Sequence, residues 1–227
     1  AMIVAVGLHL SGVLSAKEAF AGFVDPNVLL FMGMFVIGEA FFATGVAVGV
    51  GNVVHKFAKT ETSLLVAVMM ITGILSGFLS NTGTAAVLIP VIIGICKKSG
   101  FKQTKLLMPL VFAAAMGGNI SLIGAPGNMI AQAGLQQAGL GSFNFFDYGL
   151  VGLPILIVGT IFYATIGKRF LPDTPSHQPD GAFEGNDDYS HVPSWKKWTA
   201  AIILILTVVA MIFEKQLGVK LYVSAWI

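Results

Sequence analysis

Long uncharged apolar runs constrain the fold of this chain more than any other feature. They cover residues 1–13, 64–96, 106–146, 149–167 and 198–213. A helix needs roughly 20 apolar residues to cross a hydrocarbon layer about 30 Å thick. Charged residues make up only 11% of the chain and the mean hydropathy is +0.84, whereas a soluble domain carries roughly a quarter charged residues. The sequence therefore predicts an all-α, multi-pass protein of the cell (inner or plasma) membrane.

Composition also narrows the function classes. The net charge of +2 gives no nucleic-acid signal, and the single cysteine, Cys96, excludes an internal disulfide. The four histidines are scattered, and no His, Asp or Cys cluster is positioned for catalysis, so an enzyme and an organic cofactor are not expected. Both ends lie within apolar runs, and we expect the chain to be a piece of a larger membrane protein.

The pattern from residue 62 to 96 predicts a re-entrant hairpin. As one helix these residues would be about 52 Å long, far more than a membrane needs. The polar triplet Ser80, Asn81 and Thr82, followed by Gly83, interrupts the run, and such residues favour helix caps over helix interiors. We expect a second arm over residues 84–96 and a polar tip inside the membrane.

A second interruption predicts a broken helix over residues 105–138. The first half stops at Gly117, Gly118 and Asn119, and a glycine-rich turn continues through Gly124, Pro126 and Asn128. Non-helical backbone at membrane depth is tolerated only where it is buried in protein or lines a wet cavity. Further expected elements are a partial first helix, a span over 27–42, a surface helix over 43–59, a span over 149–167 and a hydrophilic cytoplasmic loop over 168–197.

The basic residues support this layout. If the hairpin enters and leaves by one face, that face holds ten of the thirteen basic residues: Lys56, Lys59, Lys97, Lys98, Lys102, Lys105, Lys168, Arg169, Lys196 and Lys197. Lys17, Lys215 and Lys220 are left on the other face. The positive-inside rule makes the ten-charge face cytoplasmic.

Two interrupted segments are the sequence pattern of a secondary transporter site. A half-helix that starts near mid-membrane presents unpaired N–H groups and partial positive charge to an anion. The arms that end near Ser80 and Gly118 present carbonyl oxygens, which suit Na⁺. Since no Arg or Lys lies near mid-membrane in this layout, an anion would need dipoles, polar side chains and a bound cation, which favours ion-coupled symport. Glu39, the one acid inside an expected span, is a further candidate.

At these residues the chain resembles the divalent anion/sodium symporter family of the ion transporter superfamily. The motifs that carry the resemblance are SGFLSNTGTAAVLIP (residues 76–90), GGNISLIGAPGN (residues 117–128) and LLFMGMFVIGEAFFATGV (residues 29–46). The resemblance implies one half of an inverted-repeat transporter that works as a homodimer by an elevator movement. Residues 1–167 would be the N-terminal transport repeat, and residues 198–227 the truncated start of the second repeat.

Carried over by motif, Ser76, Ser80, Asn81 and Gly124 would bind the first sodium ion. Asn81, Thr82 and Pro126 would face the substrate, and Gly118, Asn119 and Asn128 of the same turn are further candidates. The turn has Ala125 where the family usually has Thr, and Gly127 where it has a second Pro.

The implied function is sodium-coupled symport of a small divalent anion, with a dicarboxylate as the leading substrate. Because the turn lacks the family's hydroxyl, sulfate or another oxyanion stays open. An arsenite or Na⁺/H⁺ antiporter-type relative on the same scaffold is the alternative transporter, with Glu39 as the sole candidate for a mid-membrane acid.

Overall fold

The computed structural model describes residues 2–46, 60–171, 192–213 and 220–226, together with residues 49, 216 and 218. Within these residues the chain is helical and contains no strand, so the predicted all-α fold is confirmed. The helices in chain order are α1 (Met2–Leu10), α2 (Ala16–Phe20), η1 (Ala21–Val24), α3 (Pro26–Ala43), α5 (Glu61–Ser76), α6 (Asn81–Ser99), α7 (Thr104–Gly117), α8 (Pro126–Gln137), α9 (Gly149–Thr165), η2 (Gly167–Arg169), α10 (Ser194–Ile212) and α12 (Leu221–Ser224).

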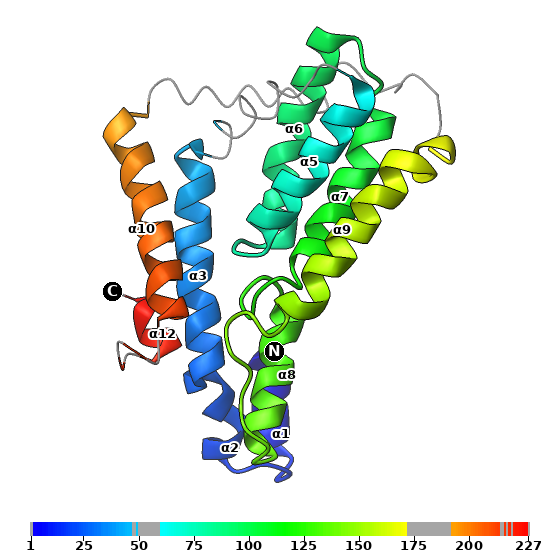
Figure 1. Cartoon of the computed structure of the whole chain (residues 1–227). Coiled ribbons are helices and arrows are strands. Elements are labelled where there is room, and N and C mark those ends of the chain that lie inside the picture. The colour runs from blue at the N-terminus through cyan, green and yellow to red at the C-terminus, as the bar shows by residue number, and fades with distance from the viewer. Residues whose placement is uncertain are drawn as a thin grey trace.

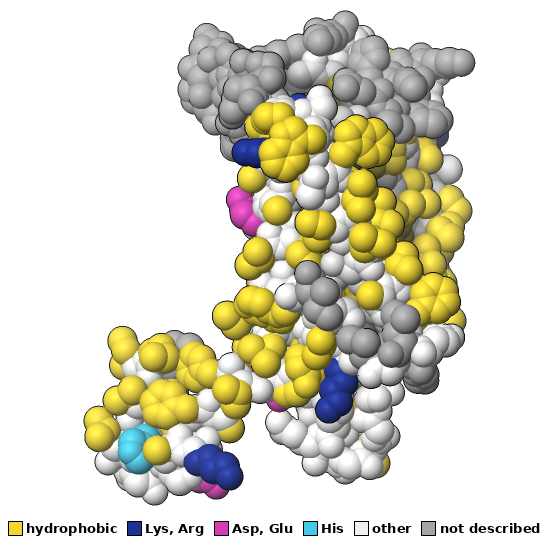
Figure 2. Space-filling model, turned by 90° about the vertical axis from the view of Figure 1, so that its left-hand side faces the viewer, with side chains coloured by type: hydrophobic (Ala, Val, Ile, Leu, Met, Phe, Trp, Pro, Cys, Tyr) yellow, Lys and Arg dark blue, Asp and Glu magenta, His cyan; other side chains and the backbone are white. Residues whose placement is uncertain are grey.

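Helix length separates two groups of apolar helices. By length and composition, α3 and α10 are long enough to cross a membrane, whereas α5, α6, α7 and α9 have shorter apolar segments. At 1.5 Å per residue, the 17 residues of α9 span only about 26 Å. Figure 2 shows hydrophobic side chains over much of one face of the molecule, with few charged side chains between them.

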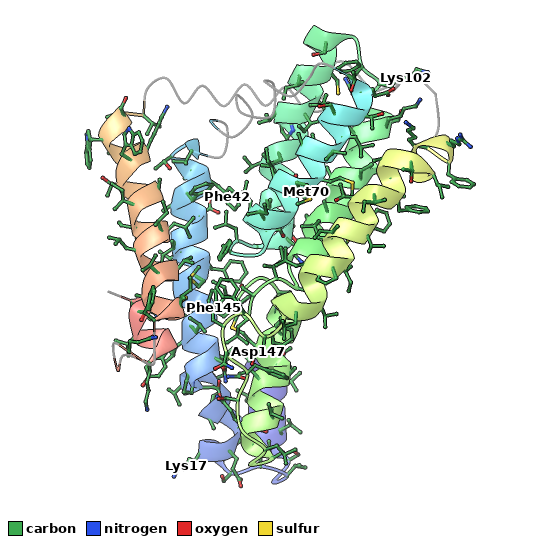
Figure 3. All side chains as sticks on the ribbon, viewed as in Figure 1. Lys17, Phe42, Met70, Lys102, Phe145 and Asp147 are labelled. Atoms are coloured by element: carbon green, nitrogen blue, oxygen red, sulfur yellow. The ribbon has the colours of Figure 1, made fainter. Side chains whose placement is uncertain are left out.

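The arms of the expected hairpin run antiparallel. Figure 1 shows that α5 begins and α6 ends at the same end of the molecule, where α7 also begins and α9 ends. In Figure 3, Lys102 lies at this end and Lys17 at the opposite end, as the charge pattern predicts. The junction of α5 with α6 and the junction of α7 with α8 both lie between the two ends (Figure 1).

Several expected boundaries differ from the structure. Helix α6 begins at Asn81 rather than at residue 84, because Ser80 serves as its N-cap. Helix α10 begins at Ser194, directly after the extended Pro193, rather than at residue 198. Most of the expected surface helix over 43–59 and of the loop over 168–197 lies outside the described residues, so those expectations stay predictions.

Two hydrophobic clusters organise the bundle. One joins α5, α6, α7 and α9 through buried side chains that include Leu65, Ile92, Leu110 and Leu156. The other joins α3, α10 and α12 to the junctions between the interrupted helices, through side chains that include Met34, Leu79, Leu122 and Met211. The junctions therefore lie against α3, between the four short apolar helices and the α3–α10 pair (Figure 1).

Glycines allow α5 to approach α7 closely, and α9 to approach the turn that follows α7. A Cβ atom at Gly117 would collide with the backbone carbonyl of Gly73, and a Cβ atom at Gly152 would collide with the carbonyl of Asn119. Both obstacles are backbone atoms, so they cannot move aside as a flexible side chain could.

We expect Gly117→Ala to destabilise the protein by about 1–3 kcal/mol, because the added methyl group forces α5 and α7 apart. Thermal melting of the purified protein in detergent measures the effect. Gly134→Ala is the matched control, since nothing lies within 4 Å of a Cβ atom there and alanine favours a helix interior. Equal melting temperatures for Gly117→Ala and the unmodified protein would contradict the close approach.

Candidate functional site

The first junction is a short turn capped by a serine. Helix α5 ends at Ser76, and Gly77 is its C-cap. Ser80 is the N-cap of α6, and its hydroxyl oxygen accepts a hydrogen bond from the N–H of Gly83 at 3.4 Å. Asn81 and Thr82 therefore lie in the first turn of α6, where backbone N–H groups lack partners within the helix.

The second junction is a longer turn held by its own side chains. Helix α7 ends at Gly117 and α8 begins at Pro126. The buried amide of Asn128 donates to the carbonyl oxygens of Gly118 and Ser121, both at 2.9 Å. The N-cap of α8 is Ala125, which offers no side-chain acceptor. The first turn of α8 is thus uncapped, in contrast to that of α6.

The two junctions are in direct contact. A Cβ atom at Gly118 would lie 2.5 to 2.9 Å from the side-chain amide of Asn81. The hydroxyl of Ser121 donates to the carbonyl of Gly77. Gly124 in turn lies against the backbone of Gly118. The sequence places these segments about 40 residues apart, and the fold brings them together.

Three oxygen atoms converge behind the first junction. The hydroxyl oxygen of Ser76 lies 2.7 Å from Asn81 Oδ1 and 2.7 Å from the carbonyl oxygen of Ala114. A serine hydroxyl has one proton and can donate it to only one of two acceptors. The Ser76 side chain is fully buried. With the amide oxygen of Asn81 toward Ser76, the cluster has more acceptor oxygens than protons, and oxygen atoms are the ligands that hard cations bind.

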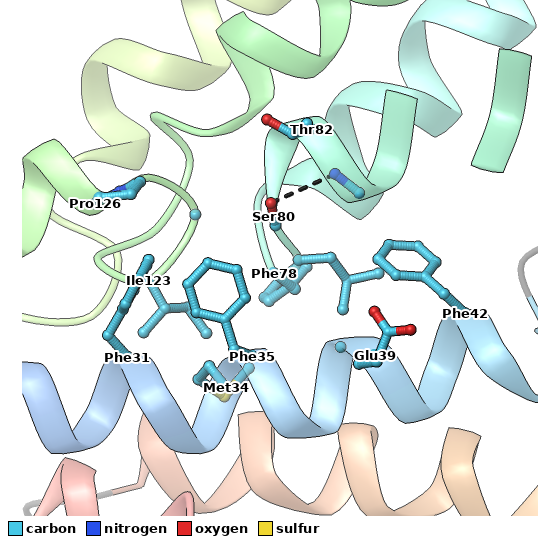
Figure 4. A pocket seen from close by; sticks show the side chains of 14 residues that line it. Phe31, Met34, Phe35, Glu39, Phe42, Phe78, Ser80, Thr82, Ile123 and Pro126 are labelled. Carbon is cyan, nitrogen blue, oxygen red and sulfur yellow. Dashed lines mark hydrogen bonds between the residues drawn. The ribbon is translucent and has the colours of Figure 1, made fainter. Parts of the chain in front are cut away.

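A cavity of about 290 Å³ opens between the two junctions and α3, close to the lower end of the range of small-molecule sites. Ser80, Thr82 and Gly83 line it from the start of α6, and Gly124 and Pro126 line it from the start of α8. Figure 4 shows Ser80 and Pro126 across the cavity from α3. The α3 wall has no polar side chain apart from one acid: its lining residues are Phe31, Met34, Phe35, Gly38, Glu39 and Phe42.

The cavity brings together some of the predicted site residues and leaves others outside. Ser80, Thr82, Gly124, Pro126 and Glu39 line it. Asn81 is directed toward Ser76 and Gly118 rather than toward the cavity. Asn128 is buried as a brace of the second junction. Asn119 is exposed, and its amide donates to the carbonyl of Ala115 at 3.4 Å. These positions describe geometry, and the roles of the residues stay predictions.

Sequence reasoning missed three residues of the site. Ala114 contributes only its carbonyl oxygen to the oxygen cluster, so its side chain carries no signal. Ser121 joins the two junctions through its hydroxyl. Thr84 is fully buried, and within the described part of the chain its hydroxyl has no hydrogen-bond partner. Thr84 stands three residues after Asn81 and so shares its helix face; a second hydroxyl residue one turn into an apolar helix was the available signal.

Comparison with known proteins supports a transport function. Over 182 residues the chain is 34% identical to a protein of Escherichia coli strain K12 named "Uncharacterized transporter YfbS", covering 80% of this chain and 30% of that protein. It is 28% identical over 172 residues to "Sodium/sulfate cotransporter 1" of Chlamydomonas reinhardtii, covering 72% of this chain and 19% of that protein. It is 26% identical over 179 residues to "Sodium-dependent dicarboxylate transporter SdcS" of Staphylococcus saprophyticus, covering 72% of this chain and 34% of that protein.

The chain thus spans about a third or less of the length of these relatives. Their names describe transporters and not enzymes, which confirms the predicted class of membrane transport protein. The family described as "Citrate transporter" matches residues 1–224. The chain therefore belongs to the citrate transporter family.

Proposed function

We propose that this chain forms one half of a sodium-coupled symporter for a small divalent anion, with a dicarboxylate as the leading substrate. The remaining residues of the site and the second sodium site belong to sequence beyond this chain. We further propose that residues 62–96 re-enter the membrane from the cytoplasmic face. The intact protein would be a homodimer that moves its substrate by an elevator movement.

The observation that carries this proposal is the contact between two interrupted helices. On one side of the contact, the Ser76 hydroxyl oxygen lies 2.7 Å from Asn81 Oδ1 and 2.7 Å from the carbonyl oxygen of Ala114. Three oxygen atoms so close together suit Na⁺. The other side opens the first turns of α6 and α8 onto one cavity through Thr82 and Pro126, which suits an anion. Cation and anion would then bind on neighbouring surfaces of the same backbone turns, and each would stabilise the other.

The uncapped start of α8 is the favoured anion contact. Ala125 offers no side-chain acceptor to the first turn. Pro126 has no N–H, and the N–H of Asn128 donates to the carbonyl oxygen of Ala125 at 3.1 Å, so the N–H of Gly127 is the first-turn donor that we assign to an oxyanion. The dipole of α8 adds partial positive charge at the same point. Thr82 is exposed at the cavity and supplies a hydroxyl donor from the opposite side.

The choice of anion rests on chemistry shared by the relatives. The names of the relatives include a sodium/sulfate cotransporter and a sodium-dependent dicarboxylate transporter, and the family is named for citrate. Each is an oxyanion with more than one negative charge. Sulfate is the second candidate, because Ala125 removes a hydroxyl that could bind the second carboxylate of a longer substrate.

Asn81→Ala should abolish sodium-dependent anion uptake, because it removes one oxygen of the cluster and the contact with Gly118. Uptake into proteoliposomes under a sodium gradient, with radiolabelled dicarboxylate, citrate and sulfate in parallel, measures the effect and identifies the anion. Asn27→Ala is the matched control, since Asn27 does not line the cavity and its amide donates to the side chain of Gln136. Retained uptake by correctly inserted Asn81→Ala would refute the assigned site.

Ala125→Thr should raise the uptake of dicarboxylate relative to sulfate by about two- to tenfold, the value of one net hydrogen bond. The backbone of residue 125 is extended, with φ −139° and ψ 143°, which suits threonine at an N-cap. Because an N-cap hydroxyl also accepts from a first-turn N–H and so weakens the binding of both anions, the ratio of the two uptake rates, and not either rate alone, measures the added donor. Competition between the two radiolabelled anions measures the ratio. Ala125→Val adds the same bulk without the hydroxyl, so an equal shift in both variants would contradict the hydroxyl's role.

A further inference from the structure

Glu39 faces the candidate anion site from the opposite wall of the cavity. It lies on α3, one turn before the helix ends at Ala43. The same cavity is lined by Thr82 and Pro126, at the starts of α6 and α8. Figure 4 shows the Glu39 carboxylate directed from α3 toward the residues of the α5–α6 junction.

The carboxylate of Glu39 has no hydrogen-bond or salt-bridge partner within the described part of the chain, and its side chain is exposed to the cavity. The other described lining residues are apolar residues, glycines, Ser80 and Thr82, none of which is charged at neutral pH. On α3 itself no other residue is ionisable, and Asp25 caps the far end of the helix. Glu39 therefore sets the sign of the charge in the cavity.

A lone negative charge is unexpected opposite an anion site. Two like charges in one cavity of partly apolar walls repel each other more strongly than in water. A monovalent cation in the cavity or at the neighbouring oxygen cluster offsets this repulsion. The unloaded cavity thus favours cations, and the anion becomes favourable only after a cation has entered.

We propose that Glu39 makes anion binding conditional on cation loading, by attracting the monovalent cation to the cavity and repelling the anion until that cation is bound. This inference rests on the proposed function. It adds Glu39 as a residue that influences ion binding through its charge. Glu39 contributes no ligand to the oxygen cluster of Ser76, Asn81 and Ala114. The carboxylate raises the affinity for the cation and lowers the affinity for the anion.

The test is Glu39→Gln, measured as sodium-dependent uptake of the transported anion by the full-length protein in proteoliposomes. Loss of the charge should raise the half-saturating sodium concentration by about three- to tenfold. It should also lower the anion KM at saturating sodium by a similar factor. The dependence of the anion KM on sodium becomes shallower. A merely structural defect would instead lower the maximal rate or weaken both ions together.

Two charge controls sharpen the test. Glu39→Asp keeps the charge and should retain the sodium dependence of the unmodified protein. Glu18→Gln removes a carboxylate outside the cavity. Hydrogen bonds from the Ser15 side chain and backbone hold the pKa of Glu18 below its usual range, so Glu18 is charged at neutral pH. Glutamine also preserves the capping box at this position.

The outcomes separate the inference from the proposed function. Unchanged sodium half-saturation in Glu39→Gln, or weakening of both ions, overturns the inference while the proposed function stands. Absence of sodium-stimulated uptake in the unmodified protein overturns the proposed function and the inference with it. If Glu39→Gln is not inserted, Glu39→Ala removes the same charge. The stabilisation of the purified protein by sodium chloride over choline chloride in thermal melts then gives the sodium half-saturation without transport.

Discussion

The structure depends on the satisfaction of peptide groups where two helices stop inside an apolar bundle. A buried N–H or C=O group without a partner is strongly unfavourable, so each interruption needs polar side chains close by. Ser80 supplies a cap for α6, and Asn128 binds two carbonyl oxygens of the second junction. Ser121 binds a carbonyl of the first junction from the second. Each turn therefore has bonds of its own, and the Ser121 hydroxyl adds a bond that ties the second turn to the first.

These bonds leave specific groups unused. The hydroxyl of Ser76 faces two acceptors with one proton, and the start of α8 has no side-chain cap. The oxygen cluster around Ser76 has too few protons for its acceptors, and the start of α8 has no side-chain acceptor. A cation completes the first and an anion completes the second, so the incomplete bonding of the fold is itself the basis of the proposed binding chemistry. The close approach at Gly117 and Gly118 keeps the two features adjacent.

The sequence predicted the features that depend on local chemistry. Both interruptions, the N-terminal span and the all-helical class follow from apolar run lengths and from the positions of Ser, Asn, Thr and Gly. The resemblance grouped Asn81 with Ser76 and set Thr82 toward the substrate, but it also set Asn81 toward the substrate, whereas Asn81 does not line the cavity. The start of α6 was expected three residues later, so the directions of its first-turn side chains could not be worked out. Once Ser80 caps the helix, each residue of the first turn takes a fixed direction.

The sequence also could not predict features that depend on contacts between segments far apart in the chain. The apolar spacing on α3 does not reveal which of its faces meets the two junctions, so the position of Glu39 in the cavity wall required the fold. The same holds for the carbonyl of Ala114, whose role depends only on where α7 lies against α5. The amide nitrogen of Asn128 braces the second junction by donating to two of its carbonyl oxygens, a structural part that the motif alone did not reveal, and its role in binding stays a prediction.

The charge balance of the cavity explains why coupling would be built into such a site. An anion site that contained an arginine would bind its substrate with or without a second ion. Here the described cavity wall has one carboxylate and no basic side chain, and helix dipoles supply only partial charges. Under the proposed function, the missing positive charge arrives with the co-transported ion. Anion affinity and cation affinity are then linked reciprocally, so each ion binds more tightly when the other is bound.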